Sequence, residues 1–356
     1  MTVERWPYEG LENRQRIRVN TPTGHDGGSG GFTVRQVGLD RPLGSLDPAL
    51  DLSIVIVNWN TRDLLDACLT SVCDYLIPLC GETIVVDNGS SDGSADMVAQ
   101  QFPGVHLIVN ATNKGFATAN NQGLELARGR YILLLNSDTL VQPDALERMV
   151  RYIGAHPSVG ALGPRLLNAD RSLQSSARNF PRLLNDSLGF LEVRRWPLVG
   201  RLAEHYDRAT ALYWDDHRQT REVDWLMGAC LLLRREALEQ VGLLDEGYFF
   251  FAEEADLCYR LRRSGWSIVF FADADIVHLG GQSSAQVPAR RLVWHYTSAL
   301  RFYCLHRSGL QQSVLRAVIA FAATTHIASL LVRHRQATHA RAILNAYLHV
   351  LVRAIR

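Results

Sequence analysis

"LSIVIVNW", residues 52–59, is a continuous run of apolar and β-branched residues that ends on polar and aromatic side chains. Three similar runs follow: ETIVVDNG at 82–89, VHLIVN at 105–110 and RYILLLNSD at 130–138. Helical patterns such as SADMVAQQF and GFATANNQGLELARG separate them. Strands that are apolar throughout and alternate with helices predict a mostly parallel sheet with helices on both faces. The sequence therefore predicts an α/β fold.

Polar side chains gather where these strands end. They are Asn58, Asn60, Asp87, Asn88, Asn113, Asn136 and Asp138. Ligands of parallel sheets bind at the carboxyl ends of the strands, so we expect a ligand site at this edge.

Asp87 and Asn88 precede a Ser/Gly-rich turn, NGSSDGS, and a helix. A carboxylate and an amide in this position can bind a nucleotide base and its ribose hydroxyls. The same residues also fit a plain Asx turn in which Asp92 or Ser94 caps the next helix. The residues alone leave both interpretations open.

Asp138 ends the predicted strand at 130–138, where a single carboxylate suits a divalent metal that keeps water and phosphate oxygens as ligands. A helix cap by Asp138 or Asp144 is the alternative. WSIVFFADADIVHLGGQSS predicts a pair of strands and places His278 at the end of the last one. A lone histidine is more often structural, but beside Asp138 it would complete a metal pair. Lys114, in NKGFATANNQG, can contact either phosphate or solvent.

GYFFFAEEADLCYRLRRSGW, residues 247–266, sets an aromatic run against Glu253, Glu254 and Asp256. Acidic residues in the first turn of a helix are stabilising by about 0.3–1 kcal/mol, which explains one of them. Three acidic residues within the four positions 253–256 are more than helix capping requires. A like charge and an aromatic wall raise the pKa of a carboxyl group, which suits a general base.

The charge of the chain is unevenly distributed, because residues 290–356 contain ten arginines and no Asp or Glu, although the net charge is +1. Such a tail predicts contact with an anionic surface. The apolar segment 317–332 spans about 24 Å as a helix, short of a bilayer core. Arg341, Asn345, His349 and Arg353 then recur every four residues, as in a basic helix lying on anionic lipid. A packed accessory helix and an oligomer interface are the alternatives; nucleic acid is disfavoured.

Several classes of protein are excluded. The chain has no phosphate-binding P-loop motif. Its six cysteines lack metal-ligand spacing and predict free thiols in a reducing compartment. The N-terminal residues lack the apolar segment of a signal peptide.

Taken in order, the motifs resemble those of inverting family 2 glycosyltransferases of the GT-A fold. They cover about residues 52–284 and comprise SIVIVNWN, VVDNGSSDGS, NKGFATANNQG, LLLNSDTLVQPDAL, the long stretch from WLMGACLLL to RLRRSG, and HLGGQSS. HLGGQSS followed by SALRFYCLHRSG is most similar to the bacterial rhamnosyltransferase branch, which builds cell-envelope glycans. The resemblance implies a polar N-terminal extension at 1–50, a GT-A domain at 51–285 and a basic amphipathic helical region at 286–356.

The resemblance also implies roles for individual residues. Glu254 stands where the family has its catalytic base, and Asp138 and His278 would bind Mg²⁺ or Mn²⁺. Asn136 replaces the first Asp of the family's D-x-D signature. The nucleotide sugar would contact Asn60, Asp87, Asn88, Lys114, Asn136 and Asp138. The acceptor side would comprise Trp225, Gly228, Glu253 and Asp256.

The expected function is a metal-dependent inverting transfer of a sugar, L-rhamnose from dTDP-L-rhamnose, to a lipid-linked or polysaccharide acceptor. The enzyme would work in the cytoplasm, peripherally on the inner face of the cell membrane. Its expected partner there is anionic lipid, and no nucleic acid is expected. Alternatively, the C-terminal region could form a homo-oligomer. A processive polysaccharide synthase is disfavoured, because no Q-x-x-R-W motif follows the carboxylates. Because Asn136 replaces the first Asp of the signature, a non-catalytic module that binds a sugar nucleotide remains an alternative function.

Overall fold

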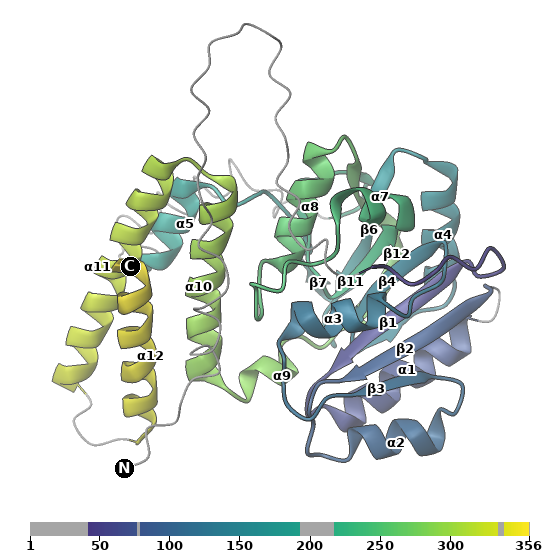
Figure 1. Ribbon diagram of the computed structural model, residues 1–356, viewed down its shortest axis with the longest axis horizontal. Helices are drawn as coiled ribbons and strands as arrows, with labels where there is room; N and C mark the ends of the chain where they lie inside the picture. The colour runs from purple at the N-terminus through teal and green to yellow at the C-terminus, as the bar shows by residue number, and fades with distance from the viewer. Residues whose placement is uncertain (1–41, 77–78, 193–216, 334–337, 356) are drawn as a thin grey trace, which may run out of the picture. The chain divides into compact units, whose positions relative to one another are not determined.

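The computed structural model describes residues 42–76, 79–192, 217–333 and 338–355. A mixed sheet with the strand order β3-β2-β1-β4-β11-β6-β12-β5 organises them (Figure 1). Its strands are β1 (Leu52–Asn58), β2 (Gly81–Asp87), β3 (His106–Val109), β4 (Tyr131–Asn136), β5 (Thr139–Val141), β6 (Val159–Leu167), β11 (Cys230–Arg234) and β12 (Ser267–His278).

The first four strands in that order run parallel, as do β6 and β12. β11 lies antiparallel between β4 and β6, and β5 lies antiparallel to β12. All seven residues of β1 are buried, which explains why its sequence shows no polar alternation. The predicted α/β fold with a mostly parallel sheet is confirmed.

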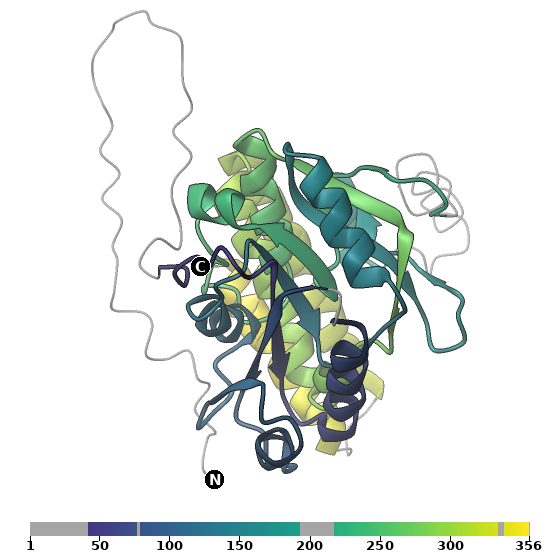
Figure 2. The same ribbon diagram turned by 90° about the vertical axis from the view of Figure 1, so that its right-hand side faces the viewer.

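Helices cover both faces of the sheet (Figures 1 and 2). Their apolar side chains form one core cluster with α1 (Arg62–Leu76), α2 (Ser94–Gln101) and α4 (Ala145–Ala155). A second cluster contains α3 (Phe116–Leu124), α7 (Arg235–Val241) and α8 (Glu253–Arg263). The central strands therefore contribute side chains to two separate cores.

β12 is one strand of 12 residues, so the predicted pair of strands is wrong. Its pairing with β6 shifts register between Phe271 and Asp275. The intervening Asp273 is exposed, as expected for a bulge that bends a strand at a sheet edge. The polar pattern of the bulge imitates a turn in the sequence.

Short elements connect β6 with β11. They are β7 (Leu173–Gln174), β8 (Ala177–Arg178), α5 (Leu183–Phe190), β9 (Arg221–Glu222) and β10 (Trp225–Leu226). β7 pairs with β6, β9 pairs with β12, and β8 and β10 form a separate two-stranded sheet. This small sheet becomes one wall of the site described below.

Four helices follow β12: α9 (Gln282–Ala285), α10 (Pro288–His306), α11 (Gly309–Arg333) and α12 (Thr338–Ile355). The last three pack side by side and belong to the same compact unit as the sheet (Figures 1 and 2). The predicted C-terminal helical region is therefore confirmed as helical.

α11 is longer than the apolar segment 317–332 suggests, because it begins at Gly309. Within the described part of the chain it is the one helix that is long and apolar enough to cross a membrane, and 22% of its most apolar window is buried. The sequence-based conclusion that the segment is too short for a bilayer is therefore wrong for the complete helix.

Residues 42–50, the end of the predicted N-terminal extension, lie along the sheet domain. The backbone N–H of Gly44 donates to Leu124 O, and the guanidinium of Arg235 donates to Gly44 O at 2.6 Å. The Gly-rich segment at 24–32 falls outside the described residues.

Candidate active site

The carboxyl ends of β1, β2 and β4 are joined by polar side chains. Asn58 Nδ2 donates to Asp87 Oδ2 at 3.2 Å, and the backbone N–H of Ser90 donates to Asp87 Oδ1 at 2.9 Å. The Thr61 hydroxyl donates to Asn58 Oδ1 at 2.6 Å and lies 2.9 Å from Ser137 Oγ. Asp87 is therefore fixed in position at the edge where the sequence predicts a ligand.

Asn88 organises the loop before α3. Its buried amide donates to Asn113 Oδ1 and Gly115 O, and accepts from the backbone N–H of Lys114 and from Asn110 Nδ2. These contacts use both ends of the amide and leave the Lys114 side chain exposed.

Asn60 adopts a left-handed conformation with φ of 53° at the start of the loop after β1. Its side-chain oxygen accepts from the backbone N–H of Ser91 at 2.8 Å, and its carbonyl oxygen accepts from Gln286 Nε2 at 2.9 Å. Asn60 thus links the β2 turn with the segment that follows α9.

Backbone pairing brings Asp138 and His278 together. His278 lies opposite Thr139 in the β12–β5 ladder, and the backbone N–H of Leu279 donates to Asp138 O. As a result, His278 Nε2 lies 3.3 Å from Asp138 Oδ1, and both side chains are buried.

Gln174 sets the tautomer of His278. Its amide nitrogen donates to Asn168 Oδ1 and to the carbonyl oxygen of His278, so Gln174 Oε1 is the atom that lies 2.6 Å from His278 Nδ1. This network assigns the proton of a neutral ring to Nδ1. The lone pair on Nε2 then lies beside the Asp138 carboxylate and the Asn136 amide nitrogen.

The same place fits a divalent cation. Asn136 Nδ2 lies 3.4 Å from His278 Nε2, and Asn136 Oδ1 is buried with no hydrogen-bond partner among the described residues. A carboxylate, an imidazole and an amide oxygen suit Mg²⁺ or Mn²⁺ when phosphate and water supply the other ligands. Over residues 42–76, 79–192, 217–333 and 338–355 no group of three His, Cys, Asp or Glu side chains could hold a metal by itself.

Glu254 lies in the first turn of α8, after a backbone that L-residues rarely adopt. Phe251 and Ala252 both have left-handed φ angles, 73° and 66°. Glu254 Oε1 accepts from the backbone N–H of Gly228 at 3.3 Å, whereas its buried Oε2 has no hydrogen-bond partner in the described part of the chain. The unpartnered oxygen is available for a proton.

The surroundings of Glu254 raise its pKa. Burial has the largest effect, and it outweighs the lowering by the backbone N–H groups of Glu254 and Gly228 and by the charge of Arg178. Glu253 is 3% exposed; burial and then the charge of Glu254 raise its pKa well above the ordinary value. Two adjacent carboxyl groups with raised pKa values favour a state in which one of them keeps its proton.

Arg178 and Trp225 form the wall beside Glu254. They are paired in the β8–β10 ladder, with the Arg178 guanidinium 5.5 Å from the Trp225 ring centre. Trp225 Nε1 donates to Asn179 O at 2.7 Å, which fixes the indole. Sequence analysis missed Arg178, because nothing in the stretch SSARNF distinguishes it.

Asp256 contacts different residues from Glu254. It is buried, its Oδ2 accepts from Arg260 Nε at 2.8 Å, and its Oδ1 lies 2.6 Å from His306 Nε2. Burial opposes the charge on Asp256, but the His306 hydrogen bond and the Arg260 charge lower its pKa overall. In this structure Asp256 connects α8 with α10.

The aromatic run before α8 packs against neighbouring helices. The Phe249 ring stacks on Trp294 of α10 at 4.7 Å, and the Phe250 ring meets Phe116 of α3 edge-on at 5.7 Å. A close approach at Gly115, where a Cβ would lie 2.8 Å from Phe249 O, draws the loop before α3 against the same run. The run is a seam between the sheet domain and α10.

The two halves of the site are neighbours because β4 pairs with β11. The backbone N–H of Asn136 donates to Ala229 O at 2.9 Å, and the adjacent Gly228 contacts Glu254. The Asp138–His278 pair and the free oxygen of Glu254 therefore lie around the same two strand ends.

Comparison with known proteins supplies a family. The model of "Glycosyl transferase family 2" matches residues 53–242. The N-acetylglucosaminyl-diphospho-decaprenol L-rhamnosyltransferase of Mycobacterium tuberculosis is 31% identical over 246 residues, which is 65% of this chain and 78% of the relative. A low-salt glycan biosynthesis hexosyltransferase of Haloferax volcanii is 27% identical over 64% of this chain and 67% of the relative. A solved mannosyltransferase from Pyrobaculum calidifontis in complex with GDP-Man and Mn²⁺ aligns with a TM-score of 0.47 and 19% identity, over 89% of this chain and 90% of that one.

Proposed function

Because the chain belongs to glycosyl transferase family 2, we propose that it transfers L-rhamnose from dTDP-L-rhamnose to a sugar carried on a polyprenyl diphosphate, in cell-envelope glycan synthesis. The 31% identity to a rhamnosyltransferase whose name specifies such an acceptor supports the choice of sugar and acceptor. The observation that carries the proposal is the free, buried oxygen of Glu254 beside the strand ends that hold Asp138 and His278.

The nucleotide would bind at the ends of β1 and β2. Asp87, fixed by Asn58 and by the Ser90 N–H, is proposed to contact the base, with Asn60 beside it. The exposed Lys114 would approach the diphosphate. Asn88 would act indirectly, by holding the backbone of Lys114.

Mg²⁺ or Mn²⁺ would be held by Asp138 and His278, with Asn136, whose amide lies 3.4 Å from His278 Nε2, beside them. When bound, the cation supplies Lewis-acid stabilisation of the negative charge on the departing diphosphate. The 3.3 Å contact between His278 Nε2 and Asp138 Oδ1 supports this assignment, as does the unpartnered Asn136 Oδ1 among the described side chains.

Glu254 is the proposed general base. Its free oxygen would accept the proton of the acceptor hydroxyl as the hydroxyl oxygen bonds to the anomeric carbon. The bond from that carbon to the diphosphate oxygen breaks in the same displacement, and its electron pair leaves with dTDP. One displacement inverts the anomeric centre and requires no enzyme nucleophile. Glu253, with its strongly raised pKa, would keep its proton and leave a single negative charge at the base.

The acceptor side would comprise Trp225 and Gly228, together with Arg178. The indole offers an apolar face on which a sugar ring can pack. Asp256, which sequence analysis grouped with these residues, is proposed to position α8 through Arg260 and His306.

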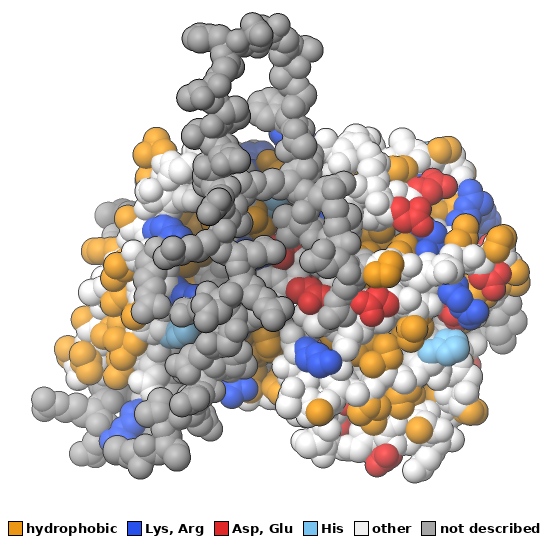
Figure 3. Space-filling model, viewed as in Figure 1, with side chains coloured by type: hydrophobic (Ala, Val, Ile, Leu, Met, Phe, Trp, Pro, Cys, Tyr) orange, Lys and Arg blue, Asp and Glu red, His pale blue; other side chains and the backbone are white. Residues whose placement is uncertain are grey.

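The C-terminal helices would attach the enzyme to the inner face of the cell membrane. Leu310, Val314 and Phe321 are exposed on α11 at spacings that share one helix face. Leu348, Val352 and Ile355 do the same on α12. Figure 3 shows hydrophobic side chains gathered over α11. Together with the basic tail, this surface suits anionic lipid; a self-association surface is the alternative that sedimentation without lipid would reveal.

The function is tested by mixing dTDP-L-rhamnose, Mg²⁺ and polyprenyl-diphosphate-linked N-acetylglucosamine with the protein. We expect release of dTDP and a product one rhamnose longer. Longer products would indicate a processive synthase. Binding of dTDP without turnover over a panel of donors and acceptors would indicate a non-catalytic sugar-nucleotide-binding module.

A further inference from the structure

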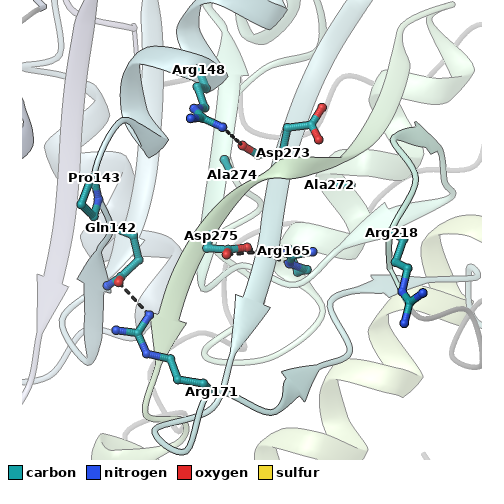
Figure 4. Close-up of a pocket in the computed structure, with 10 residues that line it drawn as sticks. All are labelled: Gln142, Pro143, Arg148, Arg165, Arg171, Arg218, Ala272, Asp273, Ala274 and Asp275. Atoms are coloured by element: carbon teal, nitrogen blue, oxygen red, sulfur yellow. Dashed lines mark hydrogen bonds and ion pairs between the residues drawn. The ribbon is translucent and has the colours of Figure 1, made fainter.

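A pocket of about 450 Å³ lies at the outer edge of β12 (Figure 4). β9 pairs with β12 only at Val269 and Phe270, and β5 pairs with it only from Ile276 to His278. The bulge between these two pairings forms the floor. The lining residues are Gln142, Pro143, Arg148, Arg165, Arg171, Arg218, Ala272, Asp273, Ala274 and Asp275.

Positive charge dominates this pocket, because four arginines face two aspartates. Asp275 is already used: it accepts two hydrogen bonds from Arg165, at 2.7 and 3.0 Å. Arg148 donates to the carbonyl oxygen of Asp273 at 3.3 Å and lies 3.6 Å from the exposed Asp144. Like charges gathered around one hollow repel each other unless an anion joins them.

Arg171 provides the sharpest signal. Its guanidinium donates to the neutral Gln142 Oε1 at 2.8 Å, and no carboxylate pairs with it in the described part of the chain. The residue occupies the tip of the β6–β7 hairpin with a left-handed φ of 65°. The tip is held there by two backbone hydrogen bonds, from Arg171 N–H to Asn168 O and from Asn168 N–H to Ser172 O. This angle is usual in a short hairpin loop, and the loop presents to the pocket a cation with which no described carboxylate pairs.

Two paths through the chain connect the pocket with the candidate active site. Asp275 precedes His278 by three residues of β12, about 10 Å along a strand. Gln174, at the base of the Arg171 hairpin, holds the His278 ring. On the other side, Pro164, next to Arg165, accepts from Ser176 Oγ, and Ser176 O accepts from the backbone N–H of Met227, the neighbour of Gly228.

We propose that this pocket binds the diphosphate group of the acceptor, with Arg171 and Arg148 as its main contacts. Among the described residues no carboxylate pairs with Arg171, and a diphosphate would supply that counter-charge. The pocket volume falls within the range of small-molecule sites, with room for an adjoining sugar. The arginines that would bind the acceptor diphosphate are therefore different residues from those proposed to bind the donor diphosphate. This inference rests on the proposed transferase function.

The test compares two acceptors of the same sugar at saturating donor, one linked to a short alkyl diphosphate and one a neutral alkyl glycoside. Arg171→Gln and Arg148→Gln should each raise KM for the diphosphate acceptor about tenfold, the size expected for losing a charge-assisted hydrogen bond. KM for the neutral acceptor and for the donor should stay unchanged. Arg151→Gln is the control, because Arg151 is an exposed arginine on α4 that pairs with Glu147 and does not line the pocket.

Equal changes for both acceptors, a rise confined to the donor KM, or no change would overturn the proposal. A calorimetric titration with alkyl diphosphate, without donor or metal, separates failure of the pocket from failure of the proposed function. Weaker binding to Arg171→Gln than to Arg151→Gln supports the pocket even if no transfer occurs. If inorganic phosphate binds as tightly as alkyl diphosphate and both variants leave the acceptor KM unchanged, the pocket serves free phosphate and the acceptor assignment is wrong.

Discussion

His306 Nε2 lies 2.6 Å from Asp256 Oδ1, and this buried contact connects a helix of the C-terminal region with the helix that carries Glu254. Arg260 completes the arrangement by donating to the other oxygen of Asp256 and to the carbonyl oxygens of Val241, Gly242 and Leu243. Asp256 is therefore held by hydrogen-bond partners on two helices. We expect these contacts to fix the position of α8.

Asp256→Asn should destabilise the protein by about 3–5 kcal/mol, because it leaves the buried Arg260 without its counter-charge. The pKa of Asp256 is lowered in the folded state, so its contribution to stability is present above the ordinary aspartate pKa and lost as pH falls through the lowered one. Urea unfolding of wild type and variant at several pH values measures this. Equal stability of the two at neutral pH would contradict the prediction; Asp63→Asn, an exposed aspartate on α1, is the control.

Glu254→Gln should lower kcat by a factor of about 10² to 10⁴, the usual contribution of a general base, while binding of dTDP stays unchanged. Rates of rhamnose transfer and a dTDP titration measure the two effects. Glu239→Gln, an exposed glutamate on α7, should behave like wild type. A variant at Glu254 that keeps full kcat would move the base to another residue.

The pH profile should reflect the raised pKa of Glu254. A base must be unprotonated, so kcat/KM should fall as pH decreases through a pKa above the ordinary glutamate range. Arg178→Gln removes a charge that lowers this pKa, so the acidic limb should move to higher pH. An unchanged limb in Arg178→Gln would show that the arginine does not act on the base.

Glu253→Gln should stabilise the protein at neutral pH. The unfolded glutamate ionises near its ordinary pKa, whereas the folded one holds its proton to higher pH, so wild type loses stability as pH rises between the two values. Glutamine has no such loss. Thermal unfolding should give a higher Tm for the variant at pH 7.5 and equal values near pH 4, with Glu236→Gln on the exposed side of α7 as control. A lower Tm at pH 7.5 would mean that Glu253 is charged and paired.

His278→Ala and Asp138→Asn should each weaken binding of Mn²⁺ by about ten- to a hundredfold or more, since each removes a ligand. Electron paramagnetic resonance of free Mn²⁺ measures binding without relying on turnover. Gln174→Leu, which removes the partner of His278 Nδ1, should give a smaller loss. Wild-type affinity in all three would contradict the metal assignment, and His156→Ala, a partly exposed histidine after α4, controls for general effects of losing an imidazole.

Sequence patterns were sufficient for the parallel strands β1 to β4 and for the polar residues at their ends, because both follow from a parallel fold. The pairing of Asp138 with His278 was expected only from the family resemblance, because the two residues meet through the antiparallel β12–β5 ladder. The bulge of β12 was misread as a turn, since Asp273 and Asp275 interrupt the apolar run just as a loop would. Glu254 and Asp256 look alike in sequence. Their different roles depend on His306, fifty positions farther on, and on Arg178 in an unremarkable stretch. Contacts of that range have no local signature.

Two contacts join α10 to the loop before Glu254. They are the Arg301–Asp245 ion pair and the hydrogen bond that the Ser298 hydroxyl donates to Phe250 O. A shortened protein that lacks the apolar helices α11 and α12 should end after Arg307, so that α10 is kept. It should not end directly after the sheet. A version ending at 285 would lack α10 as well as α11 and α12. It would expose to water Phe249 and Phe250, which pack on Trp294. We expect it to lose the proposed activity because α8 is displaced, and not because lipid contact is lost.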